Sequence, residues 1–172
     1  MDPVTGKEAA SRVAGMINAK FQVHAYSVDV TVRKVFAVDP TGEIDFGGSE
    51  YRAAGRIGVA THSRRAEDRY QWWDLSRGSY FVEFNETLSL AEDEIAVLEP
   101  DERLLRAGAA HVPLMLRGRV APLETLLEVT AMHILLKQNA RISRVRVFRF
   151  AAAKPAGKAA GKGAKKAARK RK

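Results

Sequence analysis

The fold of this 172-residue chain is decided by a stretch near its start, YSVDVTV at residues 26–32. Val28, Val30 and Val32 alternate there with aspartate, threonine and arginine. Because successive side chains of a strand point to opposite faces, three β-branched side chains line one face. The stretch therefore predicts a β-strand, which continues to residue 38 and ends at a turn formed by the sequence DPTG.

Other alternating or apolar segments predict further short strands. They lie at residues 43–46, 80–84, 88–90, 95–98, 112–116, 123–129, 132–136 and 141–150. In the last of these, the apolar phase slips at Phe148 and Phe150, which indicates a bulge or an interface. Residues 52–70 are charged and poorly periodic, so we expect a loop there that covers or borders a site.

Two segments predict helices. Thr5 and Glu8 have the spacing of a capping box, and apolar residues then recur at three- and four-residue steps, which predicts a helix over about 6–17. Residues 101–108 begin with acids and end with glycine, as one or two helical turns do. Many short strands with one leading and one short mid-chain helix indicate an all-β or β-dominated barrel or sandwich.

The net charge of +9 belongs to the end of the chain. The sequence has 29 basic and 20 acidic residues. Nine of the basic residues, and no acid, lie within 151–172: Lys154, Lys158, Lys162, Lys165, Lys166, Arg169, Lys170, Arg171 and Lys172. The basic and acidic residues of 1–150 are therefore equal in number, and this part is formally neutral.

We divide the chain into a β domain at 1–150 and a Lys/Ala/Gly-rich basic tail at 151–172. The tail has almost no side chains that could form a core, so we expect it to be disordered on its own. Its cations would neutralise phosphates of DNA or RNA without reading their sequence. A solubility tail or a contact with an anionic membrane surface is the alternative.

Several classes of protein are excluded by composition. The absence of cysteine excludes disulfides, thiolate zinc sites, iron–sulfur clusters and cysteine nucleophiles. We expect no metal site from the four histidines, which lie far apart: His24, His62, His111 and His133. No apolar run is long enough to span a membrane, and the first residues lack the pattern of a secretory signal. We therefore expect a cytoplasmic protein, associated with the nucleoid if the tail binds DNA.

Five segments, in order and covering roughly residues 20–150, resemble motifs of the dUTPase and dCTP deaminase superfamily. Residues 26–32 resemble its first motif, a small residue followed by x-Asp-Leu on an early strand, and 42–49 the hairpin that often follows. Residues 78–86 resemble the strand Gly-x-Tyr-x-Val-x-x-Asn-Glu. Residues 104–109 and 137–144 are similar to the second half of Arg-Ser-Ser-Leu-x-Arg-x-Gly and to the late turn Gly-x-Arg-Ile-Ala-Gln.

The resemblance implies a dUTPase-like distorted β-barrel that forms a homotrimer, with three nucleotide sites at the subunit boundaries. It also implies that Mg²⁺ accompanies a bound triphosphate. Members of the superfamily either hydrolyse dUTP to dUMP and pyrophosphate or deaminate dCTP. Both reactions need a water molecule that is activated by a carboxylate.

The chain departs from the superfamily at the positions that carry chemistry. Residues 101–103 are Asp-Glu-Arg where the motif has Arg-Ser-Ser, and acids there repel a triphosphate. A count without gaps puts Arg117 at the catalytic aspartate, and an arginine does not act as a general base. The deaminase glutamate falls at Thr125, or at Glu124 after a slip of one residue. Glu124 is therefore the acid/base candidate; alternatively, it is simply a polar position on a strand.

The arginines suggest a second role for the site. Arg144 replaces the late glutamine, and Arg141 is retained. Guanidinium groups suit phosphate oxygens, so a cationic pocket for phosphates is expected from Arg103, Arg106, Arg117, Arg119, Arg141 and Arg144. Alternatively, most of them are solvated or paired with the equally numerous acids. Of the adjacent Trp72 and Trp73, we expect one in the core and one at an interface, rather than a platform that stacks a base.

Two hypotheses follow from the sequence. In the first, the protein is an enzyme that acts on dCTP or dUTP. In the second, it is an inactive relative that binds a nucleotide or only assembles as a trimer, and its tail tethers it to nucleic acid.

Overall fold

The computed structural model describes residues 1–39 and 41–150. The helices are α1 (Gly6–Ala9), α2 (Ala19–Gln22) and α3 (Glu102–Arg106), with a 3-10 turn at Ala10–Arg12. The long strands are β3 (Val28–Val38), β5 (Trp72–Phe84), β7 (Glu94–Pro100), β11 (Glu124–Lys137) and β12 (Arg141–Arg149). The short strands are β1 (Asp2–Pro3), β2 (Val13–Ala14), β4 (Arg56–Gly58), β6 (Thr87–Ser89), β8 (Ala109–Ala110), β9 (Leu114–Leu116) and β10 (Arg119–Val120).

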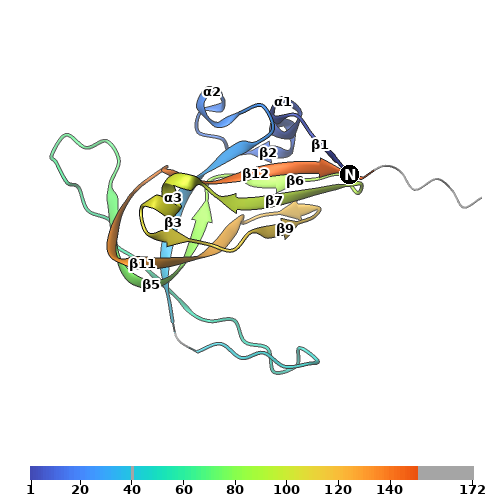
Figure 1. The fold of residues 1–172 in the computed structure, drawn as a ribbon. Coiled ribbons are helices and arrows are strands. Elements are labelled where there is room, and N and C mark those ends of the chain that lie inside the picture. Colours follow the sequence, from blue (N-terminus) through green and yellow to red (C-terminus); the bar gives the residue numbers. More distant parts are fainter. Residues whose placement is uncertain (40, 151–172) are drawn as a thin grey trace, which may run out of the picture.

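The long strands form one curled sheet in the order β8-β11-β5-β3-β12-β7-β9, with β1 added at β12 and β4 at β3. A smaller sheet joins β10, β6 and β2. Figure 1 shows α1 and α2 close together on one side of the curled sheet, while α3 precedes β8 on another. The expected β-dominated fold, with a short N-terminal helix and one short mid-chain helix, is confirmed.

The core is built on the predicted face of β3. Val28, Val30 and Val32 are completely buried there. They belong to one apolar cluster with side chains of the neighbouring strands, among them Leu75, Val82, Phe84, Leu98, Leu127, Val145 and Val147. Burial of a side chain of this size contributes about 1.5–3 kcal/mol, so this cluster fixes how β3 and β12 lie together.

The other face of β3 is buried too, because polar groups cover it. Glu86 is fully buried and accepts hydrogen bonds from Gln22 Nε2 (2.7 Å), Thr31 N (2.8 Å) and Thr31 Oγ1 (2.7 Å). Burial raises the pKa of Glu86, and the hydrogen bonds only partly oppose this shift. Glu86 thus links Gln22 of α2 to Thr31 of β3 through its hydrogen bonds.

The predicted helix over 6–17 is wrong in length. Its capping residue is confirmed, since Thr5 Oγ1 accepts from Glu8 N (3.3 Å). The helix ends at Ala9, however, and Val13–Ala14 forms a strand that pairs with Leu88 and Thr87. The apolar residues of this segment have the spacing of a helical face, but Val13 is buried because it pairs with Leu88 in the smaller sheet.

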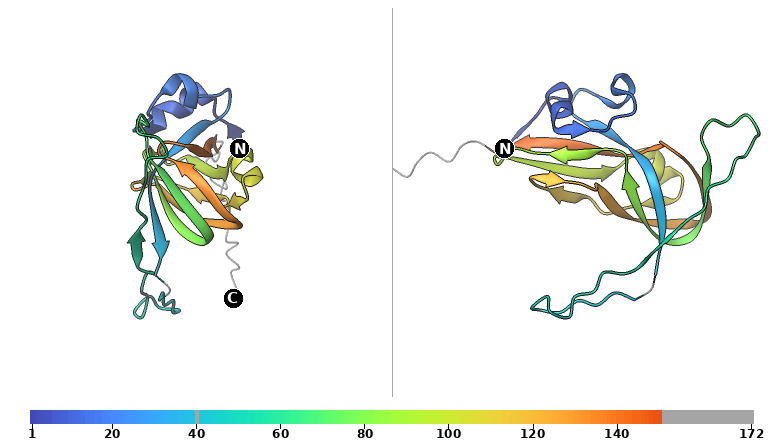
Figure 2. Two further views of the ribbon diagram at one scale, coloured as in Figure 1. Left: turned by 90° about the vertical axis from the view of Figure 1, so that its left-hand side faces the viewer. Right: turned by 180° about the vertical axis from the view of Figure 1, so that it is seen from behind.

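Three strand predictions need correction. Residues 43–46 form no strand, because only the isolated bridge between Glu43 and Arg52 is present and the segment projects from the sheet (Figures 1 and 2). The segments at 123–129 and 132–136 are one strand, β11, with an irregularity between Val129 and His133. The irregularity of β12 lies between Arg141 and Ser143, near the start of the strand.

Of the two adjacent tryptophans, one lies in the core, as expected; the expected interface position of the other is not tested by a single chain. Trp73 is 3% exposed and donates from Nε1 to Val59 O (3.1 Å), so it belongs to the core. Trp72 is half-buried at the base of the loop at residues 62–72. None of the helices in the described residues is long and apolar enough to cross a membrane.

We predict that Gly108→Ala destabilises the protein by about 1–3 kcal/mol. Gly108 ends the α3 segment at φ +86°, and a Cβ there would lie 2.7 Å from the Cβ of Ala131. The control is Gly118→Ala, at φ +61° with no atom near the added carbon, which should cost only about 1 kcal/mol. Urea denaturation of the two variants measures the difference, and equal costs would contradict the close approach of α3 to β11.

Candidate functional site

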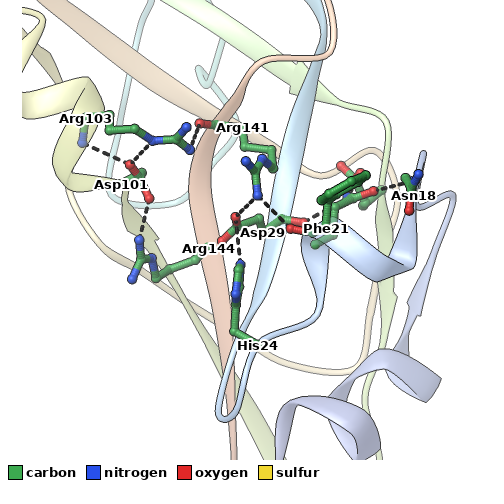
Figure 3. Close-up of polar contacts among 10 residues, drawn as sticks. Asn18, Phe21, His24, Asp29, Asp101, Arg103, Arg141 and Arg144 are labelled. Atoms are coloured by element: carbon green, nitrogen blue, oxygen red, sulfur yellow. Dashed lines mark hydrogen bonds and ion pairs between the residues drawn. The ribbon is translucent and has the colours of Figure 1, made fainter.

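A polar hollow of about 450 Å³ lies where the beginnings of β3, α3 and β12 meet. Its lining is His24, Ser27, Asp29, Asp101, Arg103, Arg141 and Arg144. Figure 3 shows the three arginines around the two aspartates, which come from different elements. Three of the arginines that the sequence nominates for phosphate binding thus share one site.

Asp29 holds one side of the hollow. It is 3% exposed, and its Oδ2 lies 2.9 Å from His24 Nε2 and accepts from Arg141 Nη1 (3.2 Å). Arg141 Nη1 also donates to the carbonyl oxygen of Phe21 (2.6 Å). Arg141 is therefore fixed by β3 and by α2 together, and its orientation is set before any ligand arrives. The second oxygen, Asp29 Oδ1, is buried and has no hydrogen-bond partner in the part of the chain that the structure describes.

Asp101 holds the other side. It is the N-cap of α3 and accepts from Arg103 N (2.9 Å), from Arg103 Nε (2.9 Å) and from Arg144 Nη2. Burial alone would raise the pKa of Asp101, but the hydrogen bonds from Arg103 and Arg144 outweigh it and lower the pKa to about 2. Asp101 is therefore ionised at neutral pH.

Arg144 is held by Asp101. Burial acts to lower its pKa, but the hydrogen bond and the charge of Asp101 raise it overall. Its buried Nε finds no hydrogen-bond partner among residues 1–39 and 41–150. Apart from His24, the three guanidinium groups and two carboxylates leave the hollow one positive charge in excess. The carboxylates fix the directions of the guanidinium groups, which is the arrangement that suits bidentate contacts to phosphate oxygens.

The remaining predicted residues do not line this hollow. Arg106 pairs with Glu102 on α3, and both side chains are exposed. Arg117 lies 5.7 Å from the centre of the Phe150 ring, and Arg119 is exposed on β10. In the described residues of a single chain, the expected six-arginine pocket is thus reduced to three members.

Glu124 has a partner that sequence reasoning did not foresee. Arg56 donates to both of its carboxylate oxygens, at 2.6 Å and 2.7 Å, across 68 positions of sequence. The pKa of Glu124 is lowered, chiefly by this hydrogen bond from Arg56. Arg56 is itself held, because its guanidinium carbon lies 4.4 Å from the centre of the Phe81 ring. The proposed acid/base carboxylate is therefore ionised and neutralised by a fixed cation.

Glu128 is a second carboxylate on the same outward face of β11. It is exposed, and it accepts a hydrogen bond from Ser79 Oγ (2.7 Å) with no arginine beside it in the described residues. In this part of the chain, Glu128 is thus not held by an ion pair as Glu124 is. The alternation of β11, in which residues 124, 126 and 128 face outward, is the sequence signal that would have nominated it.

An apolar pocket of about 410 Å³ adjoins the hollow and shares Arg103 and Arg141 with it. Its other walls are Leu104 of α3, Ala107 after that helix, and residues 134–142, which comprise the end of β11, the turn and the start of β12. A pocket with mainly apolar walls and a few polar residues, here among them Lys137 and Asn139, suits a planar heterocycle. The two cavities together offer separate environments for the two ends of a nucleotide.

Within residues 1–39 and 41–150, no group of three or more histidine, aspartate and glutamate side chains is arranged to hold a metal ion. Both carboxylates of the hollow already accept hydrogen bonds from arginine or face histidine, so they do not form a resident Mg²⁺ site. The nine basic residues of the tail lie outside the described residues.

Comparison with known proteins gives a related sequence and several structural likenesses. No protein-family model matches the chain. A probable deoxyuridine 5'-triphosphate nucleotidohydrolase of Methanosarcina acetivorans is 26% identical over 134 residues, which are 75% of this chain and 73% of that protein. The 2'-deoxycytidine 5'-triphosphate deaminase of Agrobacterium tumefaciens has a TM-score of 0.61 at 16% identity, over 85% of this chain.

These structural similarities cover only part of one or the other chain. The chain spans about half of that deaminase, since 48% of the deaminase chain is covered. A dUTPase of Streptococcus mutans is covered over 89% of its length by 56% of this chain, with a TM-score of 0.41 and 9% identity.

Proposed function

We propose that this chain, which is similar to proteins of the dUTPase and dCTP deaminase superfamily, binds and converts a deoxypyrimidine triphosphate, dCTP or dUTP. The observation that carries the proposal is the convergence of Arg103, Arg141 and Arg144 on one hollow beside an apolar pocket. The reaction is either hydrolysis of dUTP to dUMP and pyrophosphate or replacement of the cytosine amino group of dCTP by water.

The phosphates are proposed to lie in the hollow. Arginine pairs bidentately with phosphate oxygens, and charge-assisted contacts of this kind are among the strongest hydrogen bonds. Arg141 and Arg144 are already oriented by buried aspartates, so little side-chain entropy is lost when a ligand binds. The pyrimidine is proposed to lie in the adjoining pocket, between Leu104 and the turn at residues 137–140.

Magnesium enters this proposal only as a companion of the triphosphate. Mg²⁺ keeps several water molecules and is commonly held through substrate phosphates. The carboxylates of the hollow are engaged by arginines, so the phosphate oxygens would be its principal ligands. No step is assigned to the ion.

The chemical step requires a carboxylate that accepts a proton from water. Glu124 is the candidate from the sequence, and Glu128, four residues along the same face of β11, is the candidate that pairs with no arginine among the described residues. A carboxylate paired with a guanidinium is a weaker base than an unpaired one. The enzyme hypothesis therefore favours Glu128 over Glu124 as the base.

A second candidate function is nucleotide binding without turnover. It is favoured by Asp101, which lies among the arginines at the position where the superfamily motif begins with arginine, and by the pairing of Glu124 with Arg56. In this version the protein is a trimeric scaffold, and its basic tail tethers it to DNA or RNA in the cytoplasm.

The proposed homotrimer is supported by apolar side chains that one chain leaves exposed. Met132 is 82% exposed and Met115 67% exposed, and Leu126 and Leu135 also face outward on β11. Contacts between copies would remove this apolar surface from water.

The two candidate functions are separated by incubation of the full chain with dCTP or dUTP in the presence of Mg²⁺, followed by chromatography of the products. We expect dUMP or a deaminated nucleotide, with turnover reduced at least 100-fold in Glu128→Gln and less than tenfold in Glu124→Gln. Loss in Glu124→Gln alone would reverse the assignment of the base. Nucleotide binding without product would leave the scaffold function.

A further inference from the structure

A second cationic pocket adjoins the proposed nucleotide site, and of its lining residues only Lys137 also lines the apolar pocket. The cationic pocket has a volume of about 250 Å³ and is lined by Arg64, Arg65, Asp68, Trp72 and Lys137. The first three belong to the loop that joins residues 62 and 72, and Lys137 ends β11. None of its lining residues is shared with the arginine hollow. No part of the proposed reaction uses this pocket.

The cations of this pocket outnumber its one acid, Asp68. Within residues 1–39 and 41–150, no ion pair is made by Arg64, Arg65 or Lys137, whereas the arginines of the nucleotide hollow are each paired. Asp68, the acid of the pocket, accepts from the backbone N–H groups of Arg64 and Arg65, at 3.1 Å each. Asp68 thus stabilises the conformation of the loop. The pocket contains three positive side chains and one negative side chain.

Two of these cations, Arg64 and Lys137, lie against the indole ring of Trp72. The guanidinium carbon of Arg64 lies 4.9 Å, and Lys137 Nζ 5.0 Å, from the centre of the Trp72 ring. The indole face attracts each cation, but the two cations repel one another. Within the described part of the chain, the buried indole Nε1 makes no hydrogen bond of good geometry, although the Asp68 carboxylate is near enough for Trp72 to help lower its pKa. An anion in the pocket would relieve the repulsion and give the indole a better-placed acceptor.

The loop is held in place at its base. His62 and Trp72 exchange two backbone hydrogen bonds of 2.9 Å. Gln71 N donates to Gln138 Oε1 (3.0 Å), and Gln138 N donates to Gln71 O (2.9 Å), which attaches the loop to the turn after β11. Arg64 and Arg65 therefore lie on a loop that is attached at its base. Binding of a ligand would not have to be preceded by ordering of this loop, so less conformational entropy would be lost.

We propose that Arg64, Arg65, Lys137 and the indole N–H of Trp72 form a phosphate-binding site that is distinct from the nucleotide hollow. The ligand is a single phosphate group, because the pocket is smaller than the hollow and two cations already lie against the Trp72 ring, where they would compete with a stacked base. The phosphate would come either from free inorganic phosphate or from a polynucleotide backbone.

The test is a titration of the full chain with inorganic phosphate at constant ionic strength, followed by tryptophan fluorescence. We expect a saturable change that chloride does not cause and that disappears in Trp72→Phe. Arg64→Gln and Lys137→Gln should each weaken phosphate binding about tenfold or more, because each removes one charge-assisted contact.

Two matched variants control for charge and for the other site. Arg69→Gln removes a cation of the same loop whose guanidinium lies over the Tyr70 ring and outside the pocket, so phosphate binding should be unchanged. Arg144→Gln removes a cation of the nucleotide hollow and should also leave this titration unchanged. The proposal is overturned if the wild-type protein gives no saturable change, or if Arg69→Gln weakens binding as much as Arg64→Gln.

The source of the phosphate is decided by competition. A single-stranded oligodeoxynucleotide that displaces phosphate from the wild-type site, but not from Arg64→Gln, supports a polynucleotide backbone as the ligand. Absence of displacement, with the phosphate titration intact, supports free phosphate.

Discussion

Replacement of Glu94 by alanine is expected to lower the free energy of unfolding by about 3–5 kcal/mol, since it removes one partner of a buried ion-pair network. Glu94 is 1% exposed and accepts from Arg12 Nε and Nη2, both at 2.9 Å, and from Arg149 Nη2 at 2.7 Å. Ala91 N donates to it as well, at 3.1 Å. The variant would leave Arg12 half-buried and without an acid.

The pH dependence of stability should identify the same group. The hydrogen bond from Arg12 is the largest cause that lowers the pKa of Glu94, from its ordinary 4.5 to about 2. A carboxyl group with a depressed folded-state pKa contributes stability above its unfolded pKa, and this contribution is lost as the pH falls through the folded pKa. The difference between wild type and Glu94→Ala should therefore shrink between pH 4.5 and pH 2.

Urea denaturation across this pH range measures both effects. Glu94→Gln is the matched variant, because it keeps the size of the side chain and removes its charge, and it should cost less than the alanine variant. A Glu94→Ala cost below about 1 kcal/mol at pH 7, the range of exposed ion pairs, would contradict the network.

Replacement of Arg144 by glutamine is expected to weaken dUTP or dCTP binding about 100-fold. One charge-assisted contact to phosphate is worth about 1.5–3 kcal/mol, and the loss of Arg144 also leaves Asp101 less neutralised. Because the hollow has only one positive charge in excess, this substitution makes it formally neutral. Equilibrium binding of the triphosphate to purified variants measures the change.

Two further variants make this prediction specific to the hollow. Arg146→Gln removes the same charge two residues along β12, where the arginine pairs with Glu99 at 2.6 Å and lies outside the hollow, so affinity should be nearly unchanged. Asp101→Asn should strengthen binding, since it removes a negative charge and keeps an N-cap for α3. Equal losses in Arg144→Gln and Arg146→Gln would show that only the net charge matters.

The sequence predicted the strands better than the boundaries between elements. The alternation of Val28, Val30 and Val32 gives one buried face in any sheet, so β3 could be predicted without knowledge of its partners. The length of the first helix could not, because Val13 has the spacing of a helical face and yet pairs with Leu88. Pairing between segments so far apart overrides local spacing.

The site was predicted in the same uneven way. Arg141 and Arg144 are three residues apart at the start of one strand, and Arg103 is near the start of the helix that follows β7, the strand paired with β12. The sequence motifs therefore predicted Arg103, Arg141 and Arg144 as site residues, and the pairing of β7 with β12 places them close together. The pairing of Glu124 with Arg56 depends on a strand of three residues, Arg56–Gly58, within a segment expected to be a loop, and no local pattern signals it.

The central claim is that the arginine hollow binds the phosphates of a deoxypyrimidine nucleotide. Calorimetric titration of the full chain with dUTP, dCTP and deoxyuridine tests it most directly. We expect saturable binding of at least one triphosphate and binding of the nucleoside at least 100-fold weaker, since the phosphates carry the charge that the arginines recognise. Equal affinity for deoxyuridine and dUTP, or no binding of either triphosphate, would contradict the claim.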